Sequence, residues 1–171
     1  MAKKILISFV LVFIIIIIYI NWPYSSLPEN TIISKIVVEK SNHQLYLIKN
    51  GVAIKKYAIV LGKNPIGHKT KKGDSKTPEG IYFIDYKNPN SSYHLSLHIS
   101  YPNSTDKKLA LENSLDPGGM IMIHGIKNGL GFIGRLHRMF DWTDGCIAVT
   151  NHEIEEIFIV TPVGVTIEIK P

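Results

Sequence analysis

The chain has 171 residues, a formal net charge of +5 and a single cysteine. This length suits one compact domain with little added to it. One cysteine excludes an intramolecular disulfide framework and any metal site built from several cysteines, and it leaves one thiol whose role must be explained.

The start of the chain predicts a membrane segment, which we place at residues 1–24. Residues 5–20 carry no charge and are almost entirely apolar; Lys3 and Lys4 precede them, and Trp22 and Tyr24 follow. Lysines at one end and aromatic side chains at the other are typical of a single-pass helix with a cytoplasmic N-terminus. A cleavable signal peptide is the alternative, but no A-x-A-like cleavage site follows. The pattern therefore favours an uncleaved anchor, with the rest of the chain outside the inner membrane.

Residues 25–31 are predicted to form a polar linker, and residues 32–171 one extracytoplasmic domain. The domain begins with two stretches of β-branched and apolar residues, 32–39 and 44–48. A two-residue turn, Asn50-Gly51, separates the second stretch from a third. Such turns join neighbouring antiparallel strands, so the domain is predicted to open as a meander.

Lysines are concentrated between Lys49 and Lys76, where eight of them face a single acid, Asp74, giving a local charge of +7. A basic surface of this kind attracts an anionic wall polymer or a lipid surface. Equally, lysines on a hairpin edge protect it against pairing with another strand. Both interpretations stay open, and we expect no nucleic-acid partner for an exported domain.

The middle of the domain is predicted to contain further strands. Residues 81–85 follow a long loop, and residues 93–101 alternate between apolar and polar side chains, which indicates a strand. On a strand, His94 and His98 would lie about 13 Å apart, too far to share one ion. We therefore expect no metal site there, and no cofactor.

The last third of the domain is predicted to hold two more strands, a crossing segment, a helix and a final strand. The strands cover residues 120–124 and 146–149, with irregular structure between them; Thr150 and Glu153 stand in the relation of a capping box, which predicts a helix over 151–160. Alternation over 165–169 predicts the final strand. The predicted fold class is therefore mainly β, a sandwich or meander with one or two short helices, preceded by one transmembrane helix.

Cys146 is the candidate nucleophile. It follows Gly145 and precedes the predicted helix by a few residues. A free thiol is only a few per cent ionised at neutral pH, so a catalytic cysteine needs a base. His124 ends a buried strand at a glycine and is the preferred base; His137, in the crossing segment, is the alternative. The opposing interpretation is structural, with a small buried cysteine and a core histidine.

Two segments, GGMIMIHG and TDGCIAVTN, resemble the two halves of the active-site motif of the L,D-transpeptidases, the YkuD-type catalytic domain. The resemblance extends to residues 73–84 and 97–103 and covers most of residues 33–171. It implies a YkuD-like fold with Cys146 as the nucleophile and His124 as its proton acceptor and donor. It further implies that the Gly125 carbonyl holds the other imidazole nitrogen, that Gly145 lies by the oxyanion, and that Thr143 is the family's Ser/Thr position.

This sequence departs from the family's pattern at two positions. Asp144 stands where the family usually has a second histidine, and Ala148 where it usually has an arginine. An anion beside the thiol raises the thiol's pKa, unless Asp144 instead points at an imidazolium. Without the family's arginine, Arg135 or Arg138 is the candidate that binds a substrate carboxylate. The separation of 22 residues between histidine and cysteine also predicts an insertion in the crossing segment.

The resemblance implies a cysteine transpeptidase that acts on peptidoglycan stem peptides through a thioester. The acyl acceptor is another stem peptide, a wall-attached protein, or water, the last giving an L,D-carboxypeptidase or endopeptidase. The alternative from a different class is a peptidoglycan-binding module whose catalytic site has weakened. A metallohydrolase is a third possibility, distinguished by inhibition with chelators.

Overall fold

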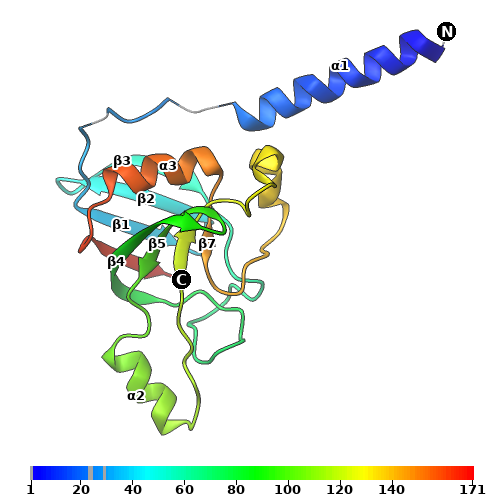
Figure 1. The fold of residues 1–171 in the computed structure, drawn as a ribbon. Helices are drawn as coiled ribbons and strands as arrows, with labels where there is room; N and C mark the ends of the chain where they lie inside the picture. Colours follow the sequence, from blue (N-terminus) through cyan, green and yellow to red (C-terminus); the bar gives the residue numbers. More distant parts are fainter. Residues whose placement is uncertain (1, 23–24, 29) are drawn as a thin grey trace.

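A computed structural model describes residues 2–22, 25–28 and 30–171; the predicted interfacial Tyr24 lies outside them. Helix α1, Ala2–Asn21, projects from the rest of the chain as a rod (Figure 1). Its apolar part, Lys3–Asn21, is 19 residues long and 6% buried. At about 1.5 Å per residue it reaches about 28 Å, close to the hydrocarbon thickness of a bilayer. By length and composition, α1 fits a membrane anchor or a signal sequence.

Within the described residues, the remaining chain is built on one eight-stranded sheet with the order β3-β2-β1-β8-β4-β5-β6-β7. The strands are β1 (Lys35–Glu39), β2 (Gln44–Lys49), β3 (Val52–Ala58), β4 (Gly80–Ser91), β5 (His94–Ile99), β6 (Met122–His124), β7 (Ile147–Ala148) and β8 (Thr166–Lys170). The mainly β class predicted from the sequence is confirmed. The opening meander is confirmed too, because β1 pairs with β2 and β2 with β3, both antiparallel.

The sheet curls until its two ends meet. Strand β8 lies parallel to β1 and antiparallel to β4, and so joins the two halves of the sheet. Beyond β3 the chain continues to Val60, which pairs with Ala148 in β7, and to Gly62, which bridges to Thr143. These two bridges form a seam between the first half of the domain and the segment that carries the cysteine.

The core fills the inside of this curled sheet. Alternate residues of the strands are fully buried; among them are Ile36, Leu45, Leu97, Ile123, Ile147 and Ile167. Helix α3, Asn151–Val160, packs on β5 and β6, and its buried Ile154 and Ile157 join the core. The capping box is present as predicted, since Thr150 and Glu153 bond reciprocally.

Two helical segments differ from the prediction. Helix α2, Ser104–Glu112, has an Asn103 capping box and extends away from the sheet (Figure 1). The crossing segment, predicted as irregular, contains the 3₁₀ helix η1, Gly131–Met139, with a kink at Gly134. Strand β4 also continues to Ser91, because β5 pairs with it well beyond the predicted end.

The lysine-rich segment does not form a uniform basic surface. Lys55 pairs with Glu156 at 2.8 Å and Lys69 with Asp74 at 2.8 Å, and all four side chains are largely buried. Lys55 and Lys56 lie on β3, the terminal strand of the sheet order, where lysines oppose strand pairing.

Candidate active site

Cys146 lies immediately before β7, at the end of a tight turn. Thr143, which is buried, fixes this turn: its Oγ1 donates to the Cys146 carbonyl at 2.7 Å and accepts from the Gly145 N–H at 3.2 Å. Gly145 has φ +130°, and a Cβ there would lie 2.6 Å from the Lys76 carbonyl oxygen. Only glycine fits this conformation so close to another backbone.

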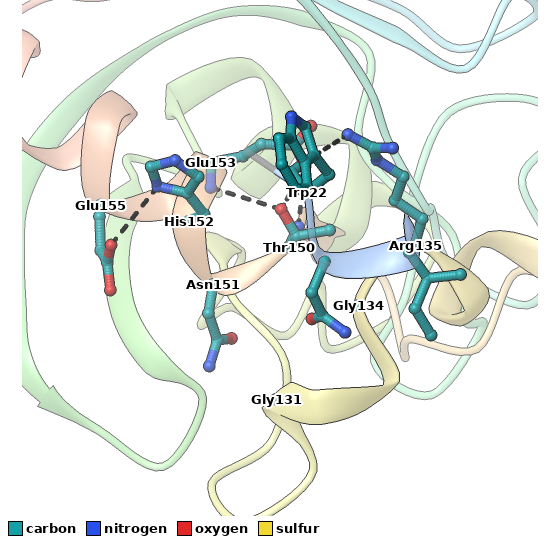
Figure 2. A pocket seen from close by; sticks show the side chains of 11 residues that line it. Trp22, Gly131, Gly134, Arg135, Thr150, Asn151, His152, Glu153 and Glu155 are labelled. Carbon is teal, nitrogen blue, oxygen red and sulfur yellow. Dashed lines mark hydrogen bonds and ion pairs between the residues drawn. The ribbon is translucent and has the colours of Figure 1, made fainter. Parts of the chain in front are cut away.

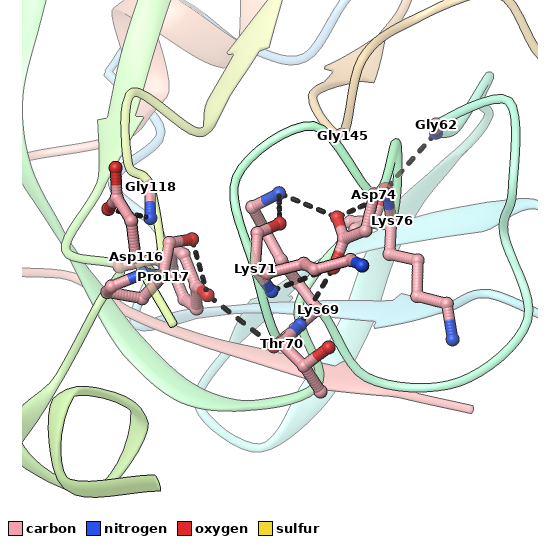
Figure 3. A network of polar contacts seen from close by, with 12 residues as sticks. Gly62, Lys69, Thr70, Lys71, Asp74, Lys76, Asp116, Pro117, Gly118 and Gly145 are labelled. Atoms are coloured by element: carbon pink, nitrogen blue, oxygen red, sulfur yellow. Dashed lines mark hydrogen bonds and ion pairs between the residues drawn. The ribbon is translucent and has the colours of Figure 1, made fainter. Parts of the chain in front are cut away.

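The loop that Gly145 contacts is held by one carboxylate. Figure 3 shows Asp74 accepting from the Lys69 ammonium at 2.8 Å and from backbone N–H groups of Thr70, Lys71 and Lys76. Burial raises the pKa of Asp74, but these hydrogen bonds outweigh burial and hold the pKa at about 2. Asp74 is therefore ionised at neutral pH and bonds to four groups of the loop that packs against the cysteine turn.

His124 ends β6, with its side chain almost fully buried. Its Nδ1 lies 2.7 Å from the Gly125 carbonyl oxygen. A carbonyl only accepts, so Nδ1 carries the hydrogen and Nε2 of the neutral ring carries the lone pair. Burial lowers the pKa of His124 to about 4, although the bond to Gly125 opposes this. The imidazole is thus neutral at pH 7 and able to accept a proton.

Strands β6 and β7 bring the histidine and the cysteine to one face of the sheet. They pair in parallel, with Ile123 opposite Ile147 and His124 opposite Ala148. The two isoleucines are buried in the core, so His124 and Cys146, one position away in each strand, lie on the other face. Both side chains line one pocket.

The pocket has a volume of about 280 Å³. Its lining residues are Ser91, Tyr93, Met120, Met122, His124, Trp142, Thr143, Asp144 and Cys146. The Tyr93 and Trp142 rings flank the imidazole, with centroids 4.6 and 5.8 Å from it. The predicted nucleophile and base therefore share an aromatic-walled pocket.

The environment of Cys146 favours the protonated thiol. Burial raises the pKa of the thiol; the backbone hydrogen bond of Met122 lowers it, the charge of Asp144 raises it, and Lys69 lowers it. The Sγ lies 3.5 Å from the Met120 carbonyl oxygen, which accepts from a thiol and not from a thiolate.

Asp144 pairs with a lysine and not with either histidine considered as a base, within the described residues. Its carboxylate pairs with the Lys63 ammonium at 2.8 Å, and the Asp144 side chain is 81% exposed. Asp144 makes no contact with an imidazolium within the described residues. Its charge instead raises the pKa of the Cys146 thiol, which is the other effect that the sequence predicts.

The other predicted residues lie outside this pocket in the part of the chain that the structure describes. Arg138 pairs with the buried Glu153, and Arg135 donates to the Trp22 carbonyl oxygen at 2.6 Å. The structure thus does not bring either arginine to the cysteine. His137 is buried against Trp142, with ring centroids 6.3 Å apart, and it does not line the pocket that holds Cys146.

Two contributors to the site were not predicted: Tyr93 and Trp142, which form its walls. Asn151 matches the polar residue that follows the family's motif; it accepts from the Ile126 N–H at 2.8 Å, which fixes the segment after His124-Gly125. Trp142 directly precedes the motif that begins at Thr143, so its place in the sequence could have marked it as a neighbour of the site. Tyr93 carried none, because it lies in the turn before β5 and comes beside His124 only through the pairing of β5 with β6.

Comparisons with known proteins identify the family of the domain. The family model for the L,D-transpeptidase catalytic domain, YkuD, matches residues 33–169. YafK of Escherichia coli K12, a candidate L,D-transpeptidase, is 32% identical over 104 residues, which are 60% of this chain and 35% of YafK.

Two solved structures share the fold. The helical cell shape determining protein Pgp2 of Campylobacter jejuni is 25% identical, with a TM-score of 0.62 over 91% of this chain and 54% of Pgp2. Bd1075 of Bdellovibrio bacteriovorus is 29% identical, with a TM-score of 0.55 over 84% of this chain and 49% of Bd1075. This chain spans about a third of YafK and about half of the other two. The expected YkuD-like fold is confirmed, and the chain belongs to the YkuD family of L,D-transpeptidase catalytic domains.

Proposed function

We propose that this chain is a cysteine-dependent L,D-transpeptidase that acts on peptidoglycan stem peptides. The observation that carries the proposal is the shared pocket, in which His124 and Cys146 lie on one face of adjacent parallel strands. Family membership supports the reaction class, and the aromatic walls suit a peptide chain that must be held away from water.

The proton transfer follows from the two pKa directions. A neutral imidazole and a neutral thiol coexist at pH 7, because burial lowers the pKa of His124 to about 4 and raises that of Cys146. His124 therefore acts as a general base: Nε2 accepts the thiol proton as Sγ attacks the carbonyl before the terminal D-residue. The C–S bond forms, the C–N bond breaks, and the imidazolium returns the proton to the departing amine.

The thioester is then resolved by an acceptor. An amine of another stem peptide or of a wall-attached protein attacks the carbonyl and releases the Cys146 thiol; water in its place gives L,D-carboxypeptidase or endopeptidase activity. Thr143 and Gly145 act as positioning residues, since their bonds fix the turn before the nucleophile.

The proposed domain organisation places this chemistry outside the inner membrane of a bacterium. Residues 1–24 form an uncleaved single-pass anchor, residues 25–31 a linker, and residues 32–171 the catalytic domain. The length of α1 and the two lysines near its start support the anchor. By analogy with Pgp2, we propose a contribution to cell shape.

A weakened binding module is the second candidate. Asp144 favours it, because an anion beside a buried thiol opposes ionisation. The exposed Lys63 partner partly cancels that charge. The two candidates differ in whether a covalent intermediate forms.

The test is incubation of the full chain in detergent with a disaccharide tetrapeptide, followed by mass spectrometry of both peptide and protein. We expect loss of the terminal residue and a thioester adduct on Cys146. Cys146→Ser should abolish the thioester, and Asp85→Asn, on an exposed strand position, should retain it. A wild-type chain that forms neither product nor adduct under reducing conditions contradicts the enzyme, and unchanged turnover in Cys146→Ser contradicts the nucleophile.

A further inference from the structure

The C-terminal end of α1 is bonded to η1, the helix inserted between the histidine and the cysteine. Arg135 donates to the Trp22 carbonyl oxygen at 2.6 Å (Figure 2). It also donates to the Tyr19 carbonyl oxygen at 3.3 Å, and Asn21 donates to the Phe132 carbonyl oxygen at 2.9 Å. The last carbonyls of a helix lack partners within it, and a cation there also suits the helix dipole. This contact therefore completes the end of α1.

Gly134 makes the close approach possible. Its φ is +48°, and a Cβ at this position would lie 2.6 Å from the Ile20 carbonyl oxygen and 2.7 Å from Asn21 Oδ1. Ile20 is buried by the contact, unlike the rest of the apolar stretch. The two helices are thus fitted to each other and share a pocket of about 230 Å³.

Five large apolar side chains of η1 and its two ends are exposed. We call them the apolar rim: Leu130, Phe132, Leu136, Met139 and Phe140. They lie on both sides of the kink at Gly134, whereas His137 between them is buried against Trp142. Met139 is 78% exposed and Phe140 67%. Large side chains in such a group mark a contact surface.

We infer that the apolar rim inserts into the outer interface of the same membrane that α1 spans, and that it holds the catalytic pocket at a fixed height over the bilayer. The inference rests on the proposed anchor. If residues 3–21 cross about 28 Å of bilayer, the residues at the end of α1 that contact η1 lie at the outer boundary of the hydrocarbon. The rim begins beside those residues and therefore lies at the same depth in the membrane.

The chemistry of the segment suits a lipid surface. Interfacial elements carry large apolar side chains on one face and basic side chains beside them. Arg135 and Arg138 alternate in the sequence of η1 with members of the rim, and Trp22 is an exposed aromatic residue directly after α1. The far end of the domain, at α2, lies opposite α1 (Figure 1). The chain therefore has a membrane-facing side and a side facing the wall.

The rim is joined to the catalytic pocket over a short distance along the chain. From Phe140 the chain passes Trp142, a wall of the pocket, and reaches Cys146 after six residues. Insertion of the rim into the membrane interface thereby fixes the direction in which the pocket opens. A flexible linker alone would leave this direction free.

The experiment uses the full chain with Cys146→Ala, carrying one new cysteine labelled with an environment-sensitive fluorophore and reconstituted in vesicles. Quenching by lipids with nitroxides on their acyl chains measures the depth of the label. Phe132→Cys and Met139→Cys probe the rim; Leu111→Cys, 79% exposed on α2, is the matched control, and Ser8→Cys reports insertion of α1.

We expect quenching at positions 8, 132 and 139, and at least fivefold less at 111. Adding Gly134→Val should reduce quenching at 132 without changing that at 8. If the label at position 8 is quenched while those at 132, 139 and 111 are equally and weakly quenched, insertion of the rim is refuted and the anchor is retained. Absence of quenching at 8 contradicts the anchor itself. A blue-shifted label at 139 without quenching indicates a protein contact, and it also overturns the rim.

Discussion

Replacement of Asp144 by Asn tests how the departure from the family's motif acts on the thiol. The Asp144 carboxylate is exposed and pairs with Lys63, and its charge raises the pKa of Cys146. Its removal should therefore increase the thiolate fraction and speed alkylation of the thiol by iodoacetamide at pH 7.

The size of the effect follows from Coulomb's law. The backbone allows at most about 7 Å between the Cα atoms of residues two apart, and we take this as the order of the distance between the two charges. In water, unit charges at that distance interact by about 0.6 kcal/mol, which is about a threefold change in an equilibrium. A screening length of about 10 Å at 0.1 M salt reduces the change to about twofold, and 1 M salt nearly removes it.

The assay compares alkylation rates of wild type, Asp144→Asn and Lys63→Met at low and high salt. Lys63→Met should slow the reaction by a similar factor, because it leaves Asp144 uncompensated. Asp85→Asn, an exposed carboxylate paired with His98, is the control and should change nothing. Slower alkylation of Asp144→Asn than of wild type would refute action through a screened charge. So would a ratio of the two alkylation rates that is the same at low salt and in 1 M salt.

Three further predictions concern stability. Thr143→Val should lower the free energy of unfolding by about 2 kcal/mol in urea titrations, because it leaves the Cys146 carbonyl and a buried N–H without partners, whereas Thr143→Ser should cost less than half of that. Burial lowers the pKa of His124 from 6.5 to about 4, so the unfolded chain binds the proton first and stability is lost as pH falls through this window. The melting temperature of His124→Gln should depend less on pH there; equal slopes for both proteins would contradict this. Gly62→Ala should destabilise by about 1–3 kcal/mol, since its Cβ would overlap a backbone carbonyl, while Gly119→Ala, with contacts no closer than 3.9 Å, should be neutral in the same titrations.

Local patterns predicted the elements whose signals are local. The alternation over 93–101 predicted β5, and the Thr150 capping box predicted α3 with its correct bounds. The Asn103 and Asp106 pair that begins α2 is the same kind of signal, and its detection would have added that helix. These cases share one cause, because each signal depends on residues within one turn or strand.

Long-range arrangement could not be predicted in the same way. The position of β8 between β1 and β4 depends on pairings across more than 80 residues, and no short pattern records them. The same holds for Tyr93 beside His124, and for Arg135, whose partner lies at the end of α1. The motif predicted Cys146 and His124 as candidates, whereas the pocket around them required the sheet.

The seam between Val60 and Ala148 and between Gly62 and Thr143 has a consequence for the timing of reactivity. The segment that carries Thr143 and Cys146 is bridged to the chain that follows β3, which precedes it by about 80 residues in the sequence. An unfolded chain therefore lacks the pocket that brings His124 and Cys146 together, and this pocket forms with the closed domain. Because Cys146 is the only cysteine in the sequence, the rate at which a small thiol reagent modifies it also measures how often this seam opens, without any introduced cysteine.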